Sequence, residues 1–378
     1  MKFNMNRRFA LLSLAALLAL GGCSEWTDME SVTIKEPQVE KSEAYMQAIR
    51  DYKASEHKVL IGWFDNVALP GDRSQHLTVL PDSIDIVVLQ HPELITEALA
   101  AEAAEIRTRM GTRTLSSVSF AELEAAFEAQ QQTTPAADES GEEGGDEGSG
   151  QEGGDGGDEG GDEGGEQPQK PAADAFTLFC NDYVARVMAL CDTWALDGVS
   201  VAYDGRSTTQ MPDAEKESYL SRQQAFLAAV AAWRTAHPDR MLLFEGTPQY
   251  LADASLLEGC DYIILKMFTQ TTVADLDRAL RLALTDNVPS DRIVIGVESW
   301  PLDAADTKTG RFQTEEGKEG RAVIEVARWM NRYDAGCSKS GLAVNHLQYD
   351  YFNPYRIYQY TREAIGLMNY APKTTTEL

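Results

Sequence analysis

Cysteine and histidine are scarce in this chain of 378 residues, which contains five of each. That number of cysteines is too small for the disulfide framework of a small secreted domain. Cys180 and Cys191 lie in a segment of helical periodicity, which places them roughly 16 Å apart and beyond disulfide reach. They are expected to be buried, unbonded thiols. The histidines are scattered rather than paired at the spacing of a zinc site, so we predict neither a metal nor a cofactor.

Clusters of lysine and arginine are also missing. The formal net charge is −27, with 33 basic and 60 acidic residues. Thirteen of the acidic residues lie in one segment, 138–166, so the rest of the chain carries a charge of about −14. Nucleic-acid phosphates require clustered basic side chains, and this balance argues against a nucleic-acid partner.

The hydrophobic run at the N-terminus is too short to cross a bilayer. It follows three basic residues and ends in small residues before Cys23, which is typical of a signal peptide. The sequence LGGC at 20–23 fits a bacterial lipobox, in which cleavage leaves a cysteine that carries lipid. We predict a signal peptide over 1–22, lipidation of Cys23 and a membrane-anchored tether over 23–45. Acidic residues after the cysteine favour an outer-membrane lipoprotein exposed at the cell surface, and a periplasm-facing position stays open.

Eight apolar segments alternate with helical patterns along most of the chain. The predicted strands are 58–64, 84–90, 112–118, 198–204, 240–246, 262–268, 292–298 and 344–350. Near-continuous apolar strands between amphipathic helices indicate a parallel sheet covered by helices. Eight repeats predict a single α/β domain, a (β/α)8 TIM barrel over 46–372 with a closing helix from about Thr361. A doubly wound open sheet is the alternative, but no Gly-rich phosphate loop follows the first strand.

An acidic, glycine-rich segment interrupts this alternation at 130–170. Its composition cannot bury a core, which predicts a disordered insertion in a loop at the C-terminal face of the barrel. Carboxylates beside glycines are also calcium ligands, but this repeat lacks the apolar positions that would pack a β-roll. The insertion either borders a ligand cleft, or its charges only repel one another and keep the segment solvated.

The fourth predicted strand reads LDGVSVAYD and carries the most informative pattern. Functional residues of a (β/α)8 barrel lie at the C-terminal ends of its strands. The pattern resembles the signature of glycoside hydrolase family 18, Asp-Gly-x-Asp-x-Asp-x-Glu, and the resemblance extends over the barrel to the lipoprotein endo-β-N-acetylglucosaminidase-like branch. Asp197 and Gly198 match. Ser200, Ala202 and Asp204 stand where the family has its other three acidic residues.

The resemblance implies that these replacements remove hydrolysis. In the family, the last Glu protonates the glycosidic oxygen while the preceding Asp orients the substrate's own N-acetyl oxygen as the nucleophile. Because Asp is one methylene shorter than Glu, the carboxyl group of Asp204 lies about 1.5 Å further back. A displacement of about 1 Å can cost roughly 100-fold in rate. Ala202 removes the orienting acid altogether. On the sixth strand, Lys266-Met267-Phe268 replaces the Gln-x-Tyr of the endoglycosidase branch, so a hydroxyl donor is lost as well.

Aromatic and polar side chains at the strand ends remain to bind a glycan. Sugar rings stack on aromatic faces, and polar neighbours bind the hydroxyl groups. Alternation along each strand directs about half of such residues toward the helices, where an aromatic side chain simply packs. The candidate glycan-binding residues are Trp63, Asp65, Tyr203, Asp204, Glu245, Lys266, Phe268, Gln270, Trp300, Gln348, Tyr349 and Tyr351. Tyr355 is a further candidate for the cleft.

Three hypotheses follow for the function. The favoured one is a surface-anchored protein that binds N-acetylglucosamine-containing glycans, such as N-glycans, beside a companion glycosidase or glycan transporter. The second is a working hydrolase in which Asp204 acts with Glu245 or Glu298, which requires two carboxyl groups about 5 to 9 Å apart. The third is a scaffold that binds protein partners through the acidic insertion.

Overall fold

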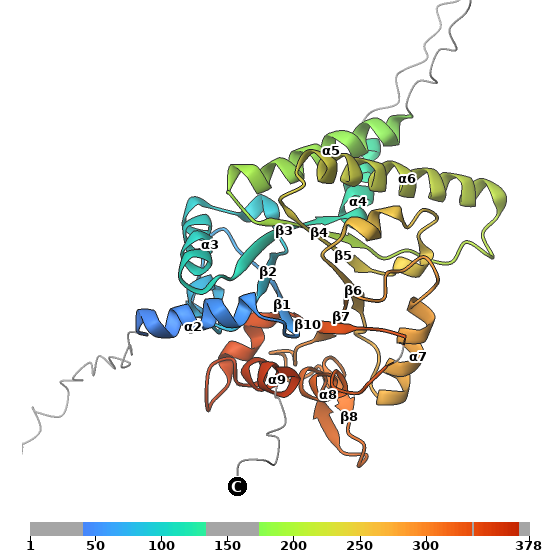
Figure 1. Cartoon of the computed structure of the whole chain (residues 1–378). Coiled ribbons are helices and arrows are strands. Elements are labelled where there is room, and N and C mark those ends of the chain that lie inside the picture. Colours follow the sequence, from blue (N-terminus) through green and yellow to red (C-terminus); the bar gives the residue numbers. More distant parts are fainter. Residues whose placement is uncertain (1–40, 134–173, 335, 370–378) are drawn as a thin grey trace, which may run out of the picture. The chain divides into compact units, whose positions relative to one another are not determined.

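The computed structural model describes residues 41–133, 174–334 and 336–369. Within these residues, eight parallel strands form a closed barrel in the order β1-β10-β7-β6-β5-β4-β3-β2 (Figure 1). The predicted (β/α)8 barrel is therefore confirmed. The strands are β1 (Val59–Phe64), β2 (Ile86–Leu89), β3 (Arg113–Ser119), β4 (Gly198–Tyr203), β5 (Met241–Gly246), β6 (Tyr262–Lys266), β7 (Ile293–Glu298) and β10 (Lys339–Asn345).

Helices surround the barrel (Figure 1). A small antiparallel hairpin of β8 (Arg311–Gln313) and β9 (Glu319–Arg321) precedes α8. None of the helices that the structure describes has the length and apolar character needed to cross a membrane. The helices are α2 (Glu43–Ala54), α3 (Glu97–Met110), α4 (Phe120–Thr133), α5 (Ala175–Thr193), α6 (Asp213–Ala236), α7 (Val273–Ala283), α8 (Ala322–Trp329) and α9 (Gln359–Asn369).

The eighth barrel strand differs from the prediction. Strand β10 ends at Asn345, and the predicted strand region 344–350 instead contains most of a 3-10 helix, η6 (Leu347–Phe352). His346 stands between them with a left-handed φ of 48°, which ends the extended chain. The apolar pattern places the eighth strand too late in the chain, because β10 begins with Lys339, a residue type typical of loops. This lysine is buried, and its ammonium group lies 4.0 Å from the centre of the Trp329 ring.

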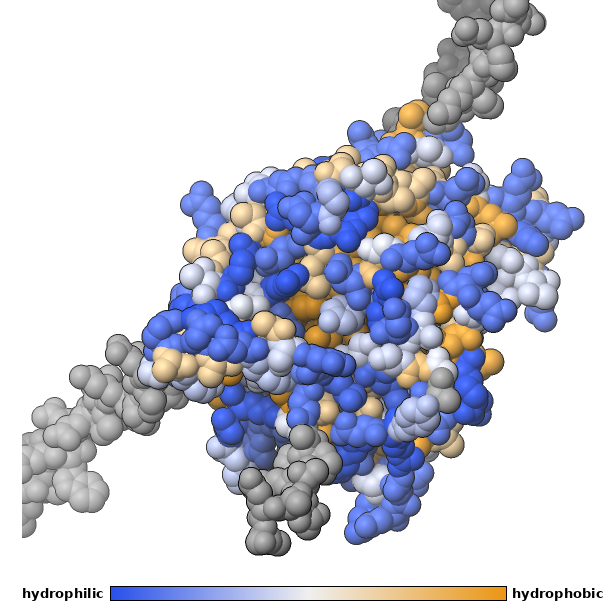
Figure 2. All heavy atoms as spheres, viewed as in Figure 1, coloured by the Kyte–Doolittle hydropathy of each residue, from blue (hydrophilic) through white to orange (hydrophobic). Residues whose placement is uncertain are grey.

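Strand residues alternate between two cores, as expected for a barrel. Ile61, Trp63 and Leu243 point into the barrel, whereas Leu60 and Phe64 pack against the surrounding helices. In the view of Figure 2, hydrophobic residues are visible at the centre of the molecule, within a rim of hydrophilic ones.

The cysteines bear out the sequence prediction. Cys180 and Cys191 lie on α5 and are buried, unbonded thiols. The other two cysteines described, Cys260 and Cys337, are also buried and free. Several predictions fall outside the described residues: the signal peptide, the lipidation of Cys23, most of the tether and nearly all of the acidic insertion.

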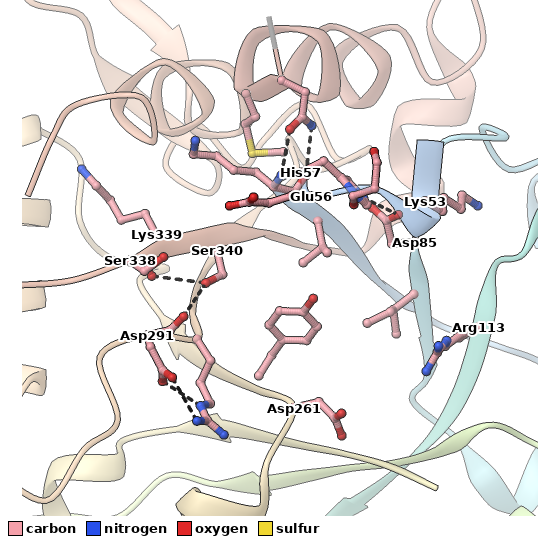
Figure 3. Close-up of a pocket in the computed structure, with 18 of the residues that line it drawn as sticks. Lys53, Glu56, His57, Asp85, Arg113, Asp261, Asp291, Ser338, Lys339 and Ser340 are labelled. Carbon is pink, nitrogen blue, oxygen red and sulfur yellow. Dashed lines mark hydrogen bonds and ion pairs between the residues drawn. The ribbon is translucent and has the colours of Figure 1, made fainter. Parts of the chain in front are cut away.

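Charged residues line a large cavity, of about 1020 Å³, at the N-terminal ends of the strands (Figure 3). His57 shares a hydrogen bond of 2.9 Å with Asp85, which also accepts the backbone N–H of Leu60. Lys53 donates to Thr112 and to a backbone carbonyl, and burial lowers its pKa to about 8. These groups bind one another and the strand ends. In this fold the N-terminal face serves stability, so we look for function at the opposite end.

Candidate functional site

A cavity of about 150 Å³ lies at the C-terminal ends of the strands, and we call it the mouth cavity. It brings together four of the predicted binding residues, Trp63, Glu245, Lys266 and Phe268. Its volume is small beside the roughly 300–1,000 Å³ of typical small-molecule sites, so it can enclose only part of an extended ligand. The lining residues are Trp63, Gln90, Ser117, Ser119, Glu122, Ala202, Glu245, Lys266, Phe268 and Asn345.

Strand β4 directs the replaced family positions into the barrel. Ala202 lines the mouth cavity, and the hydroxyl of Ser200 donates to Glu245 Oε1 over 3.1 Å. The alternate residues Val199 and Val201 belong to the outer core, as the period of a strand requires. A methyl group and a hydroxyl therefore occupy the interior where the family signature has two carboxylates.

Glu245 is the most deeply buried acid of the cavity, with 2% of its surface exposed. Desolvation raises its pKa, and the negative charge of Asp204 adds to that effect. Lys266, Ser200 and the Trp63 indole oppose it by favouring the charged form. Nε1 of Trp63 is buried and has no described hydrogen-bond partner within normal geometry.

Asp204, at the position of the family's general acid, is paired rather than free. Its carboxylate lies 3.0 Å from the ammonium group of Lys266, at the rim of the cavity. The Asp204 side chain is 59% exposed, whereas that of Lys266 is 20% exposed. Lys266 thus pairs with Asp204, and its positive charge also favours the ionised form of the buried Glu245.

We expect Glu245→Gln to stabilise the protein at neutral pH but not in acid. A carboxyl whose pKa is raised on folding binds protons more tightly when folded, so it lowers stability as the pH rises from about 4.5 through the folded pKa. The glutamine carries no such cost and can still accept from Ser200. The variant should therefore unfold at a higher temperature than the wild type at pH 7.5 and lose this advantage at pH 4.0.

Thermal unfolding of the variant and the wild type at pH 4.0 and pH 7.5 measures this difference. A variant that is less stable at pH 7.5, or equally more stable at both pH values, would show that desolvation does not dominate at Glu245. Lys266 keeps Asp204 as its partner in the variant, so no unpaired ammonium group complicates the comparison.

Asp65 and Gln348 form a polar network beside the mouth cavity. Asp65 Oδ2 lies 2.6 Å from Nδ1 of His346 and accepts the Gln348 amide over 2.8 Å. The carboxylate of Asp65 raises the pKa of His346. Glu298 is also engaged, because both of its oxygens accept from Asn345, at 3.0 and 3.1 Å. These residues hold the ends of β1, β7 and β10 together and do not line the cavity, except for Asn345.

Three further predicted residues do not line the mouth cavity either. Tyr203 follows the inward-facing Ala202, so it points to the helices, where it is buried and its hydroxyl bonds to Gln223 and Tyr219. Tyr351 packs edge-on against Tyr358 and the outer core. Gln270 lines none of the cavities described. The predicted place of Tyr203 and Tyr351 in the cleft is therefore wrong, because both side chains pack in the outer core. The place of Gln270 stays a prediction.

Trp300 and Tyr349 line a separate cavity of about 270 Å³, which we call the aromatic pocket. Tyr355, the further candidate, also lines it. Alternation along the strands could not have located this pocket, because none of its residues lies on a barrel strand. The lining residues are Ser299, Trp300, Pro301, Leu302, Arg321, Val323, Tyr349, Asp350, Phe352, Asn353, Pro354, Tyr355, Tyr360 and Thr361.

Comparison with protein families gives a match to glycoside hydrolase family 18, BT1044-like, over residues 25–151 and 162–367. Among solved structures, a glutamate-to-glutamine variant of BT1044 is 18% identical, with a TM-score of 0.55, over 86% of this chain and 92% of that one. An endo-β-N-acetylglucosaminidase from Cordyceps militaris is 15% identical, with a TM-score of 0.59, over 87% and 97%.

A double variant of the same fungal enzyme, in complex with fucosyl-N-acetylglucosamine-Asn, gives a TM-score of 0.57 at 15% identity, over 87% of this chain and 97% of that one. At these identities the solved structures show a shared fold. No curated protein sequence matches the chain.

Proposed function

Because the chain belongs to glycoside hydrolase family 18, in its BT1044-like group, we propose that it binds N-acetylglucosamine-containing glycans, such as N-glycans, without hydrolysing them. The observation that carries the proposal is the Ala202 methyl group in the wall of the mouth cavity, where the family signature has the orienting carboxylate. At the general-acid position, Asp204 is bound by Lys266. Substrate-assisted hydrolysis then lacks its orienting acid, and the shorter acid at the general-acid position is held in a salt bridge.

The remaining groups of the mouth cavity suit a sugar. Trp63 and Phe268 meet edge to face, with ring centres 5.8 Å apart, and form an apolar wall. Glu245, Lys266 and Asn345 supply acceptors and donors for hydroxyl and acetamido groups. The complex of the fungal enzyme with fucosyl-N-acetylglucosamine-Asn supports this ligand class, since that enzyme shares the fold.

We also propose that the protein is held at the outer membrane, exposed at the cell surface, by lipid on Cys23. The support is the sequence at residues 20–23. Metabolic labelling with a radioactive fatty acid tests it, because a Cys23→Ser variant should lose the label. A companion glycosidase or a glycan transporter would then act on the glycan that this protein retains.

A second candidate function is hydrolysis in which Asp204 acts together with Glu245. Burial raises the pKa of this carboxyl, and a general acid needs such a shift. The two functions differ in product. A hydrolase releases sugar from a bound glycan and loses this activity in Glu245→Gln, whereas a binding protein returns the glycan intact.

We expect Phe268→Ala to weaken glycan binding about tenfold. The substitution removes an aromatic wall of the mouth cavity, and a loss of about 1.4 kcal/mol corresponds to that factor. Titration calorimetry of the mature protein with an N-glycan oligosaccharide measures the change. Tyr333→Ala is the matched control, because this tyrosine is 92% exposed and lines neither the mouth cavity nor the aromatic pocket. Equal affinities for both variants would remove the mouth cavity from the binding site.

A further inference from the structure

The aromatic pocket lies beside the mouth cavity but is built from other residues. It is formed by the chain that follows β7 and β10 and by the beginnings of α8 and α9. Among the described residues, the two cavities have no lining residue in common. They are linked through the backbone, because Ser299 of the pocket follows Glu298, which holds Asn345 of the mouth cavity.

Two helices begin at this pocket, and only one of them is capped by an acid. Asp350 accepts the backbone N–H and the hydroxyl of Thr361, at 2.7 and 2.8 Å, and thereby caps the start of α9. Helix α8 follows Arg321, whose side chain makes no capping hydrogen bond. The acid of its first turn, Glu325, pairs with Arg328. A helix N-terminus favours an anion. At the start of α8 no acidic side chain takes the capping position.

Arg321 adds a full positive charge at the same place. Its guanidinium carbon lies 3.5 Å from the ring centre of Trp300 and 3.9 Å from that of Tyr360. Among the described residues it forms no salt bridge, whereas its neighbour Arg311 pairs with Glu319 at 2.6 Å. The nearby Asp350 is already committed to α9.

The Trp300 ring is not itself open to a sugar. Arg311 and Arg321 lie 3.6 and 3.5 Å from its centre, about the contact distance of stacked groups. Two guanidinium groups can approach so closely only from opposite faces. Trp300 therefore positions Arg321, and its indole N–H is used by the carbonyl of Gly310.

Exposed apolar side chains form the outer part of the pocket. Tyr355 is 87% exposed, Leu302 55% and Phe352 52%. Ser299, at the inner side, is only 5% exposed, and its hydroxyl has no described hydrogen-bond partner. A buried hydroxyl without a hydrogen bond lowers the stability of the protein unless a ligand or water supplies the missing bond. The pocket thus combines a cation, a free hydroxyl and aromatic surface.

We infer that the aromatic pocket binds an acidic sugar unit, with its carboxylate on Arg321 and the start of α8 and its ring against Tyr355 and Phe352. Arginine suits a carboxylate because its planar fork can donate two parallel hydrogen bonds. This inference rests on the proposed function and extends it. The mouth cavity holds the N-acetylglucosamine part of a glycan, and the aromatic pocket selects chains that carry a sialic or uronic acid.

Titration of the mature protein with small glycosides tests the pocket by itself. The probes are the methyl α-glycoside of N-acetylneuraminic acid, methyl glucuronide and methyl galactoside, followed by saturation-transfer NMR. Sulfate, which has no protons to observe, is added as a competitor, and its affinity is read from the loss of the glycoside signals. We expect the two acidic glycosides to bind at least tenfold more tightly than the galactoside or sulfate. Arg321→Gln and Tyr355→Ala should each weaken that binding about tenfold, whereas Arg113→Gln, at the other end of the barrel, and Tyr333→Ala should not.

The inference is overturned if the galactoside or sulfate binds as well as the acidic glycosides, or if Tyr355→Ala leaves their affinity unchanged. Because Tyr355 is exposed, its variant is informative even where Arg321→Gln disturbs the packing of Trp300. Failure of the proposed function has a different signature. Neutral N-acetylglucosamine oligosaccharides would then fail to bind, while Phe268→Ala would leave the affinity for the acidic glycosides untouched.

Discussion

A Gly198→Ala variant is expected to be recovered only as unfolded or insoluble protein. The new Cβ would lie 2.1 Å from the carbonyl oxygen of Met241 and 2.7 Å from its nitrogen and carbonyl carbon. Met241 is the register partner of Gly198 on β5, so the obstacle is the backbone of a neighbouring barrel strand. A closed barrel cannot move one strand alone. The cost should exceed the roughly 1–3 kcal/mol of ordinary overpacking and approach the whole stability of about 5–15 kcal/mol.

Soluble yield and circular dichroism measure this effect. Gly259→Ala is the matched control, because a Cβ at that glycine meets no described atom within 4 Å. The control should unfold within about 2 °C of the wild type. A Gly198→Ala protein that is soluble and melts in the same range would contradict the tight approach of β4 and β5. The glycine of the family signature therefore has a structural reason in this chain, independent of catalysis.

Restoring the family acids at positions 202 and 204, at the end of β4, is expected to produce hydrolysis that we expect the wild type to lack. Ala202→Asp adds a carboxylate to the wall of the mouth cavity, and Asp204→Glu extends the acid by one methylene. The new carboxylate would also compete for Lys266, which releases the acid at position 204 from its present salt bridge. Because the family's mechanism requires both acids, the double variant should exceed the background at least 100-fold, and neither single variant should.

Mass spectrometry of an N-glycan substrate after long incubation detects the released sugar. The control is the double variant Ala202→Asn with Asp204→Gln, which has nearly the same shape but no carboxylates and should stay inactive. A restored variant that folds and binds glycan but releases nothing would show that the lost acids alone do not explain the missing activity. The changed residues at the C-terminal end of β6, Lys266 and Phe268, would then be the next to restore.

The barrel could be predicted because buried parallel strands are near-continuous apolar runs. Strand β10 shows the limit of this signal. Lys339 reads as polar, yet its ammonium group is held over Trp329, a contact between residues on different elements that periodicity does not reveal. Within the site, alternation placed Ser200 and Ala202 correctly. The same rule excludes Tyr203 from the cleft, because it follows an inward-facing residue.

The aromatic pocket could not be predicted as a unit. Trp300 was identified as an aromatic residue after a strand, but its ring is covered by Arg311 and Arg321, which the β8–β9 hairpin places against it. Neither arginine stands in a recognisable motif. Besides Trp300, the sequence analysis named Tyr349 and Tyr355, which line the pocket from the segment after β10.

The most direct test of the account is titration calorimetry of the mature protein with N-glycan oligosaccharides, combined with product analysis of the same mixtures after long incubation. Binding in which the glycan is recovered intact is the result that Ala202 and the Lys266–Asp204 pair predict. Release of sugar that disappears in Asp204→Ala or Glu245→Gln would contradict it and make the protein a working hydrolase.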